Sequence, residues 1–314
     1  MSEKIDILVP VYNVKKFLTK CLDSLINQTY KNINIIINEN GSTDGSEQIV
    51  EDFAKKYENI KVFHTPNEGN ISKARNFLLS KIESKYFTFF DSDDYADPEY
   101  IETLYNLLVE NNSDMSICSI KRVAENKSVN LKKINKKLNS VLLFDKQTAI
   151  AEMISSKLYF GSVYAKLMKT EMLGEIKFDE NIHYAEDLDF CFNIMQNCKN
   201  FVFTNKKLYA YVIRKNSIVT SKFKPKKLTV LDCYNRIIEK VKHDEVLTVC
   251  AKSMKGLIST ELLYYVWRDK YKDKELKKLL KQNIKESIPF IRKNKRLPSI
   301  YKKLPLVWWL TKLM

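Results

Sequence analysis

Three carboxylates follow an apolar stretch in the first third of the chain. Residues 87–94 read Phe-Thr-Phe-Phe-Asp-Ser-Asp-Asp, which places Asp91 and Asp93 one residue apart at the carboxyl end of a predicted buried strand. Ligands bind at that edge in open α/β sheets, and carboxylate oxygens suit Mg²⁺ or Mn²⁺, ions that in turn suit a diphosphate. The pair is a candidate divalent-metal site, but Asp-x-Asp alone is common by chance and gains its value from the motifs before and after it. Asp94 is interpreted as a helix N-cap or a turn residue.

Alternating strands and helices are predicted to position these carboxylates. Strands at 5–9, 33–37 and 60–63 are each followed by a segment with a helical pattern. In the first of these helical segments, apolar residues recur every three or four positions from Phe17 to Ile26. This alternation predicts an α/β fold with a mostly parallel sheet flanked by helices.

Five short motifs stand in a fixed order along this pattern. They are Pro10–Asn13, Glu39–Asp44, Asn67–Asn76, Asp91–Asp94 and Glu186-Asp187. Because these motifs occur in this order and at this spacing, the chain resembles the family 2 glycosyltransferases, which have the GT-A fold. The resemblance covers roughly residues 4–217. It implies an inverting enzyme that moves a sugar from a nucleotide sugar to an acceptor hydroxyl, with Mn²⁺ or Mg²⁺ as cofactor.

The resemblance also implies roles in donor binding. Asp93 corresponds to the direct metal ligand, and Asp91 supports the ribose or the metal. Tyr12 can stack on the base, and Glu39 stands where the family has an aspartate that accepts a hydrogen bond from uracil N3. The donor-binding set is Pro10, Val11, Tyr12, Glu39, Asn67, Arg75, Asp91, Ser92, Asp93 and Arg214.

Two arginines of this set have structural alternatives. Arg75 follows a loop that contains glycine, and it either holds the donor phosphate or base or is a structural residue on a helix face. Arg214 belongs to a segment, residues 209–217, that resembles a family pattern of Tyr, Arg and Ser. It either reaches the diphosphate or merely begins the basic C-terminal region.

The chain departs from the family pattern at two places. Glu39-Asn40-Gly41-Ser42 replaces Asp-Asp-Gly-Ser, so the first carboxylate is one methylene longer and the second is neutral. Recognition of uracil, from the UDP-sugar expected as donor, then needs a shifted geometry. Tyr164-Ala165 replaces Trp-Asn in a segment that lies near the acceptor in the family. The acceptor chemistry is therefore expected to differ.

A catalytic base is expected where a later helix begins. Asp187 matches the base of the family, and Glu186 stands beside it, ahead of a helix whose core face includes Leu188, Cys191 and Phe192. The alternative is that these acids only favour the helix electrostatically, since an acid in a first turn contributes about 0.3–1 kcal/mol. One base and no competing nucleophile predict a single displacement with inversion.

Charge is distributed unevenly along the 314 residues. Residues 214–314 carry 26 Lys and Arg against 9 Asp and Glu, whereas residues 1–213 carry 27 against 29. We therefore expect a GT-A domain at 1–217 and a helical, basic region at 218–314.

No nucleic-acid motif accompanies this basic charge, so an anionic membrane surface is the predicted partner of the C-terminal region. Its segment 284–314 interleaves basic residues with aromatic and apolar ones, including Phe290, Ile291, Trp308 and Trp309, as an interfacial helix does. The alternative is that these side chains cover the domain's own core or lie in a homo-oligomer contact.

Cysteines, the N-terminus and hydropathy predict a cytoplasmic protein, and the basic C-terminal region suggests a location at the inner face of the plasma membrane. The six cysteines include no Cys-x-x-Cys pair, which predicts reduced, buried thiols. No apolar run approaches the roughly 20 residues that span a bilayer, and the first residues lack a secretory signal.

The expected acceptor is a glycan on a lipid or protein, in the synthesis of cell-surface polysaccharide or glycoprotein, and the transferred group is a hexosyl or N-acetylhexosaminyl unit. Two alternatives remain open, a nucleotidyltransferase and a non-catalytic protein that binds glycan or nucleotide on a transferase fold. The first would need a Gly-rich signature bearing Lys or Arg after the first strand, and Pro10–Asn13 is not one.

Overall fold

The computed structural model describes residues 3–214 and 222–297, which belong to two compact units. The first unit comprises Met1–Lys146, Ser162–Glu180 and Asn193–Lys215. The second comprises Gln147–Gly161, Asn181–Phe192 and Asn216–Met314. The second unit thus draws on three separate stretches of chain, and the domain boundary expected at residue 217 stays a prediction.

The first half of the sheet is parallel, as the alternation of strands and helices predicts. Its strands lie in the order β3-β2-β1-β4 and are β1 (Ile5–Val11), β2 (Ile33–Glu39), β3 (Ile60–His64) and β4 (Tyr86–Phe89). Ile7 is in register with Ile35 on one side and with Thr88 on the other. The carboxyl ends of β1, β2 and β4 therefore meet at one edge, where the motif residues follow them.

The other half of the sheet is mixed. It continues from β4 in the order β8-β6-β9-β5, with β7 also paired to β9. These strands are β5 (Tyr95–Ala96), β6 (Met115–Ala124), β7 (Val141–Asp145), β8 (Lys166–Lys169) and β9 (Asn200–Ile213). β8 runs antiparallel to both β4 and β6, whereas β6 and β9 are parallel. Sequence periodicity does not reveal such a reversal, because buried strands read as apolar runs in either direction.

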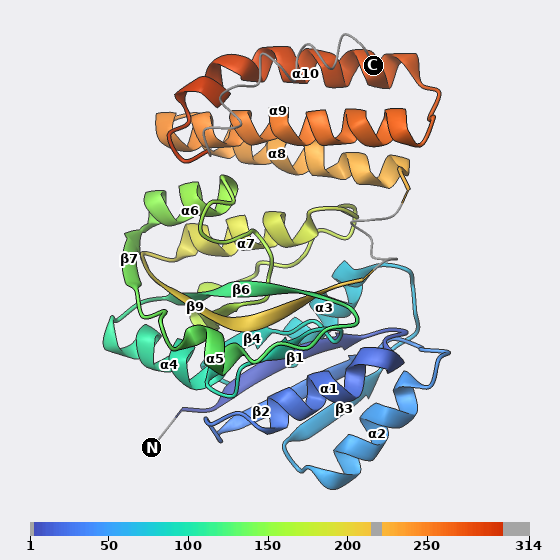
Figure 1. The fold of residues 1–314 in the computed structure, drawn as a ribbon, viewed down its shortest axis with the longest axis vertical. Helices are drawn as coiled ribbons and strands as arrows, with labels where there is room; N and C mark the ends of the chain where they lie inside the picture. The colour runs from blue at the N-terminus through green and yellow to red at the C-terminus, as the bar shows by residue number, and fades with distance from the viewer. Residues whose placement is uncertain (1–2, 215–221, 298–314) are drawn as a thin grey trace. The chain divides into compact units, whose positions relative to one another are not determined.

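Helices cover both faces of this sheet. The helices of the first unit are α1 (Lys15–Ile26), α2 (Ser46–Lys56), α3 (Ile71–Leu79), α4 (Tyr100–Glu110), α5 (Leu131–Asn135) and the short η1 (Thr170–Met172). Except for its first residue, α6 (Lys146–Ile154) belongs to the second unit, and α7 (Glu186–Asn197) begins in the second unit and ends in the first. Alternate residues of β1, such as Ile5 and Ile7, share one core with Leu18 and Leu22 of α1, which lies along the sheet in Figure 1. α3 packs against β1 and β2 as well, where Asn38 Nδ2 donates to the carbonyl of Ala74 (3.4 Å).

A buried carboxylate holds the parallel strands together. Asp6 of β1 is fully buried, and its oxygens accept hydrogen bonds from Asn34 Nδ2 of β2 (2.9 Å) and from the amides of Glu83 (2.8 Å) and Ser84 (2.9 Å). These amides immediately precede β4. One side chain thus ties three neighbouring strands and fixes where β4 begins, and with it the turn of carboxylates that follows.

The C-terminal region is helical, as predicted. It contains η2 (Pro225–Leu228), α8 (Thr229–Lys240), α9 (Glu245–Arg268) and α10 (Lys274–Lys293), and Figure 1 shows the last two lying side by side. Asp244 and Asp273 cap α9 and α10 by accepting from main-chain amides. A Cβ on Gly256 of α9 would lie 2.3 Å from the Cβ of Ser287, so the two helices approach too closely there for any larger residue.

The cysteines and the hydropathy of the helices agree with the expectations from the sequence. All six cysteines are buried thiols, as expected. Within residues 3–214 and 222–297, no helix is both long enough and apolar enough to cross a bilayer.

Candidate active site

The predicted metal ligands lie in a turn that is attached to the end of β1. Beyond β4 the chain passes through Asp91, Ser92 and Asp93, and Ser92 Oγ donates to the carbonyl of Pro10 (2.7 Å). The side chains of Asp91 and Asp93 are 23% and 16% exposed, so both carboxylates remain accessible. Pro10 contributes its carbonyl to this contact, and Val11 is fully buried.

Two arginines that are far away in sequence converge on these carboxylates. Arg75 of α3 is 5% exposed, and its Nη2 lies 3.4 Å from Asp91 Oδ1. Arg214, directly after β9, places Nε 2.6 Å from Asp93 Oδ2. Each predicted metal ligand is thus next to one guanidinium group, the side chain best suited to a phosphate as well. Arg214 stands at the carboxylates and does not simply begin the basic region.

Asp94 has a structural role. Its Oδ2 accepts from the hydroxyl of Tyr209 (2.7 Å) and its Oδ1 from the amide of Val212 (2.7 Å). The Tyr209 oxygen in turn accepts from the amide of Asp91 (3.2 Å). Asp94 is therefore the turn residue expected from the sequence and not a helix N-cap, since strand β5 follows it. It joins the carboxylate turn to β9, the strand that ends before Arg214.

Burial and neighbouring charges shift the pKa values of two carboxylates in this turn. Burial, followed by the charges of Asp93 and Asp91, raises the pKa of Asp94 well above its usual range. Burial also raises the pKa of Asp93, and the nearby Arg214 opposes the increase. The accessible, hard oxygen donors of Asp91 and Asp93 fit a divalent cation.

Glu39 adopts a geometry that its sequence position does not reveal. The side chain is 2% exposed, and its oxygens accept from the amides of Gly41 (3.0 Å) and Ser42 (2.7 Å). The extra methylene lets the carboxylate fold back onto its own turn, where Gly41 has a φ of 68°. Because each carboxylate oxygen has two lone pairs, each oxygen keeps acceptor capacity for a ligand.

His64 belongs to the same site, although the sequence analysis did not select it. It is paired with Glu39 in the register of β3 and β2, and its Nδ1 lies 3.6 Å from Glu39 Oε2. Its Nε2 is 2.8 Å from Glu51 Oε1, and this hydrogen bond raises the pKa of the imidazole. The register of two predicted parallel strands was the signal that could have found it.

Residues of two motifs, Glu39–Asp44 and Asn67–Asn76, border a pocket in the first unit. Its volume is about 390 Å³, and its lining includes Asn40, Thr65, Asn70 and Lys73. Asn40 Nδ2 donates to Thr65 Oγ1 (2.8 Å), which links the turn after β2 to the loop after β3. In that loop Asn67 Oδ1 accepts from the amide of Gly69 (2.7 Å) and shapes the turn that leads to α3.

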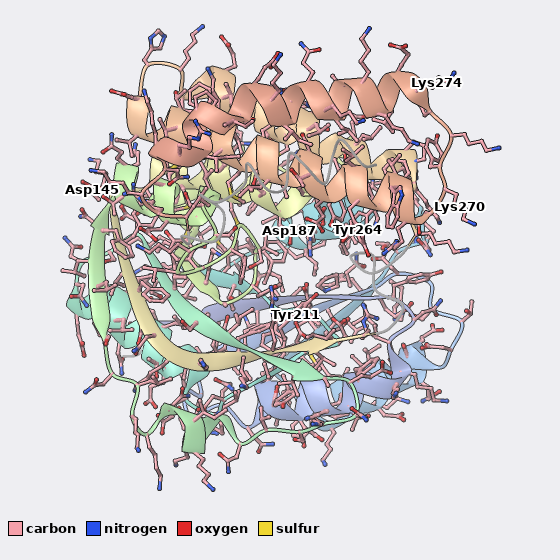
Figure 2. All side chains as sticks on the ribbon, turned by 45° about the horizontal axis from the view of Figure 1, so that its top comes forward. Asp145, Asp187, Tyr211, Tyr264, Lys270 and Lys274 are labelled. Atoms are coloured by element: carbon pink, nitrogen blue, oxygen red, sulfur yellow. The ribbon has the colours of Figure 1, made fainter. Side chains whose placement is uncertain are left out.

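Two aromatic positions of the sequence analysis differ in exposure. Tyr12 is 47% exposed, and so its ring is available to a ligand. Tyr164, which replaces a tryptophan of the family, is 9% exposed and stacks on Tyr209 (4.7 Å between ring centroids) and on Tyr211 (5.8 Å); Tyr211 is labelled in Figure 2. Tyr164 is therefore a core residue of the first unit.

Asp187 and Glu186 occupy the first turn of α7, as expected, in the part of that helix that belongs to the second unit. Both side chains are half-buried, and Asp187 is labelled in Figure 2. Leu188, the residue after Asp187, packs directly against Gly161. A Cβ on Gly161 would lie 2.5 Å from Leu188 Cδ1.

Known glycosyltransferases are similar to this chain in sequence. GlyA, a glycosyltransferase of Streptococcus pneumoniae, is 35% identical over 224 residues, which are 69% of this chain and 32% of GlyA. The poly(ribitol-phosphate) beta-glucosyltransferase of Bacillus spizizenii is 32% identical over 218 residues, 68% of this chain and 33% of that enzyme. The aligned part thus spans about a third of the length of both relatives.

Solved structures show the same fold. Residues 1–349 of S. aureus TarS in complex with UDP-GlcNAc match 96% of this chain and 83% of that one, with a TM-score of 0.66 and 22% identity. The mannosyltransferase PcManGT of Pyrobaculum calidifontis, in complex with GDP-Man and Mn²⁺, covers the whole chain and is itself 88% covered, with a TM-score of 0.58 and 12% identity. The family model "Glycosyl transferase family 2" matches residues 6–177. The chain therefore belongs to the family 2 glycosyltransferases, and its fold is GT-A.

Proposed function

We propose that this protein transfers a sugar from a nucleotide sugar, a UDP-sugar, to a hydroxyl of a surface glycan. The observation that carries the proposal is the convergence of Arg75 and Arg214 on Asp91 and Asp93 at the carboxyl edge of the parallel strands. Two guanidinium groups beside two accessible carboxylates suit a diphosphate bound together with a divalent cation. The UDP and UDP-GlcNAc complexes of TarS support a uridine nucleotide.

The proposed donor site uses the residues of the sequence motifs. The exposed ring of Tyr12 stacks on the base. The Glu39 carboxylate accepts a hydrogen bond from the base through lone pairs that the amides of Gly41 and Ser42 do not use. Asn67 lies in the loop beside the pocket. The floor of the proposed donor site is formed by Pro10, Val11 and Ser92, where the Ser92 hydroxyl donates to the carbonyl of Pro10. Arg75 and Arg214 hold the phosphates.

Asp93, with Asp91, would hold the Mn²⁺ or Mg²⁺ ion. When bound, such an ion neutralises the charge that grows on the leaving diphosphate. The Mn²⁺ complex of PcManGT supports a divalent cation. The positive charges of Arg75 and Arg214, beside Asp91 and Asp93, would reduce the repulsion between these carboxylates and the donor phosphates.

Asp187 is the proposed general base, with Glu186 beside it. The acceptor oxygen bonds to the anomeric carbon while the bond from that carbon to the diphosphate oxygen breaks, and Asp187 takes the hydroxyl proton. A single displacement of this kind inverts the anomeric configuration. The names of the curated relatives support an acceptor in a cell-surface polymer and a hexosyl or N-acetylhexosaminyl group.

A donor panel tests this function. UDP-, GDP- and dTDP-linked hexoses and N-acetylhexosamines would each be incubated with the protein and Mn²⁺, and release of the nucleotide would be measured. We expect release from at least one UDP-sugar, because hydrolysis of the donor needs no acceptor. A protein that releases no nucleotide from any donor, with or without a glycan acceptor, contradicts the proposal.

We also propose that the basic helical region contacts an anionic membrane. Four lysines of α10 are exposed: Lys274, Lys278, Lys281 and Lys285. In the last turns of α9, Tyr264 and Trp267 are 44% and 50% exposed. Figure 2 shows Tyr264, Lys270 and Lys274 around the end of α9 and the start of α10. Ile291, one of the apolar residues expected at the membrane, is instead buried in the helical unit. Trp308 and Trp309 lie outside the described residues, and a homo-oligomer contact stays the alternative.

Liposome binding is expected to depend on these lysines and on salt. Co-sedimentation with anionic vesicles should fall steeply between 0.1 and 1 M salt, because the Debye length shrinks from about 10 Å to about 3 Å. The triple variant Lys270→Glu, Lys274→Glu, Lys278→Glu should bind poorly at any salt. The matched control is Lys16→Glu, Lys55→Glu, Lys61→Glu, which changes three exposed lysines of the first unit. Equal binding of neutral and anionic vesicles by the wild type would refute the membrane contact.

A further inference from the structure

One side chain of the helical region holds the segment that leads into α7. Thr229, the first residue of α8, accepts hydrogen bonds through Oγ1 from the amides of His183 (3.2 Å) and Tyr184 (3.0 Å). The same hydroxyl donates toward the carbonyls of Tyr184 (3.2 Å) and Lys226 (2.9 Å). A threonine hydroxyl has one hydrogen and two lone pairs, and all of them are used here. Thr229 therefore fixes the backbone three residues before Asp187.

The backbone is strained at Ala185, between Tyr184, which Thr229 contacts, and the start of α7. Ala185 has a φ of 73°, in the left-handed region that residues with a Cβ disfavour. Its carbonyl accepts from the amide of Asp189 (3.2 Å), so this residue sets the direction in which α7 begins. A strained conformation persists only where its surroundings hold it. The hydroxyl of Thr229 holds the residue immediately before Ala185.

Lys227 supports the same segment from the side of α9. It is 4% exposed, and its Nζ lies 5.6 Å from the centre of the Tyr184 ring and 4.8 Å from that of Tyr265. The residues before Lys227 are attached to α9 as well, because the amide of Phe223 donates to Asp269 Oδ2 (2.6 Å). A continuous series of contacts thus runs from the end of α9 through residues 223–229 to Tyr184.

We propose that Thr229, assisted by Lys227, is a positioning residue that orients the carboxylate of Asp187 for catalysis. This inference rests on the proposed role of Asp187 as the general base. A base must lie within hydrogen-bond reach of the proton that it abstracts, and a displacement of about 1 Å can cost roughly 10²-fold in rate. The basic helical region is then part of the catalytic machinery, in addition to any surface that it contacts.

Three threonine variants test the proposal. Thr229→Val keeps the shape of the side chain but removes every hydrogen bond of the hydroxyl, and we expect kcat to fall about 10- to 100-fold with the donor KM unchanged. Thr229→Ser keeps the hydroxyl and should restore kcat to near that of the wild type. Thr248→Val is the matched control in the same unit, since it removes a hydroxyl bond to the carbonyl of Val241 (2.8 Å) that has no contact with residues 183–187. It should keep the wild-type kcat.

The outcomes separate positioning from folding and from the proposed function. Thermal melting of each variant shows whether it folds. If Thr229→Val does not fold, Lys227→Met carries the test, and the same loss of kcat at constant donor KM is expected. Wild-type kcat in a folded Thr229→Val or Lys227→Met variant would overturn the proposal, and so would an equal loss of kcat in Thr248→Val. A wild-type protein that is inactive toward every donor would instead contradict the proposed function.

Discussion

Asp93→Asn is expected to remove metal-dependent turnover. The substitution keeps the shape of the side chain but deletes one of the two accessible carboxylates at the predicted cation site and leaves the Arg214 guanidinium, now 2.6 Å from Asp93, without its partner charge. Weakening the cation beside a leaving diphosphate should cost about 4 kcal/mol of transition-state stabilisation, or roughly 10³-fold in kcat/KM. Nucleotide release would be measured over a titration of Mn²⁺ and again in EDTA.

The control for this experiment is Asp52→Asn, which changes an exposed carboxylate on α2 in the same unit. It should keep wild-type activity and metal dependence. An Asp93→Asn enzyme with full turnover, or a wild-type enzyme indifferent to EDTA, would show that the cation does not bind at this turn.

Asp187→Asn is expected to separate donor binding from chemistry. The proposed donor residues belong to the first unit, whereas Asp187 belongs to the second, so the affinity for the nucleotide sugar should stay close to that of the wild type. Turnover should fall by ~10²–10⁴-fold, because an amide cannot take the proton of the acceptor hydroxyl. Donor affinity would be measured by calorimetry and turnover by product formation with the acceptor present.

Asp232→Asn, an exposed carboxylate on α8, is the matched control and should retain both properties. If donor affinity collapses together with the rate in Asp187→Asn, the carboxylate has a structural role at the start of α7, as the helix-dipole alternative predicts. The base would then have to be sought elsewhere.

Local sequence patterns were sufficient for the first half of the fold. The strands that begin at Ile5, Ile33 and Ile60 and the helices after them follow from alternating periodicity. Four of the five motifs stand at or just beyond the carboxyl end of a parallel strand, whereas Glu186-Asp187 begins α7. Asp91 and Asp93 could be selected because a short apolar strand leads directly into them. These features depend on residues that are neighbours along the chain.

Long-range pairing accounts for what the sequence did not reveal. The contact between Arg214 and Asp93 requires β9 to return beside the carboxylate turn, and the bonds of Asp94 to Tyr209 and Val212 fix that return. The fold-back of Glu39 onto Gly41 and Ser42 depends on one methylene, whose effect appears only in three dimensions. The antiparallel entry of β8 has no signature in hydrophobic periodicity.

The composition of the second unit bears on how such enzymes could be recombined. Because that unit combines Asn216–Met314 with Gln147–Gly161 and Asn181–Phe192, a chimera joined at a single point near residue 217 would inherit α8 from one parent and the segment before Asp187 from the other. The hydroxyl of Thr229 would then meet a backbone that had not evolved with it. Exchange of the helical region between relatives should therefore preserve activity only when all three stretches are transplanted as one set.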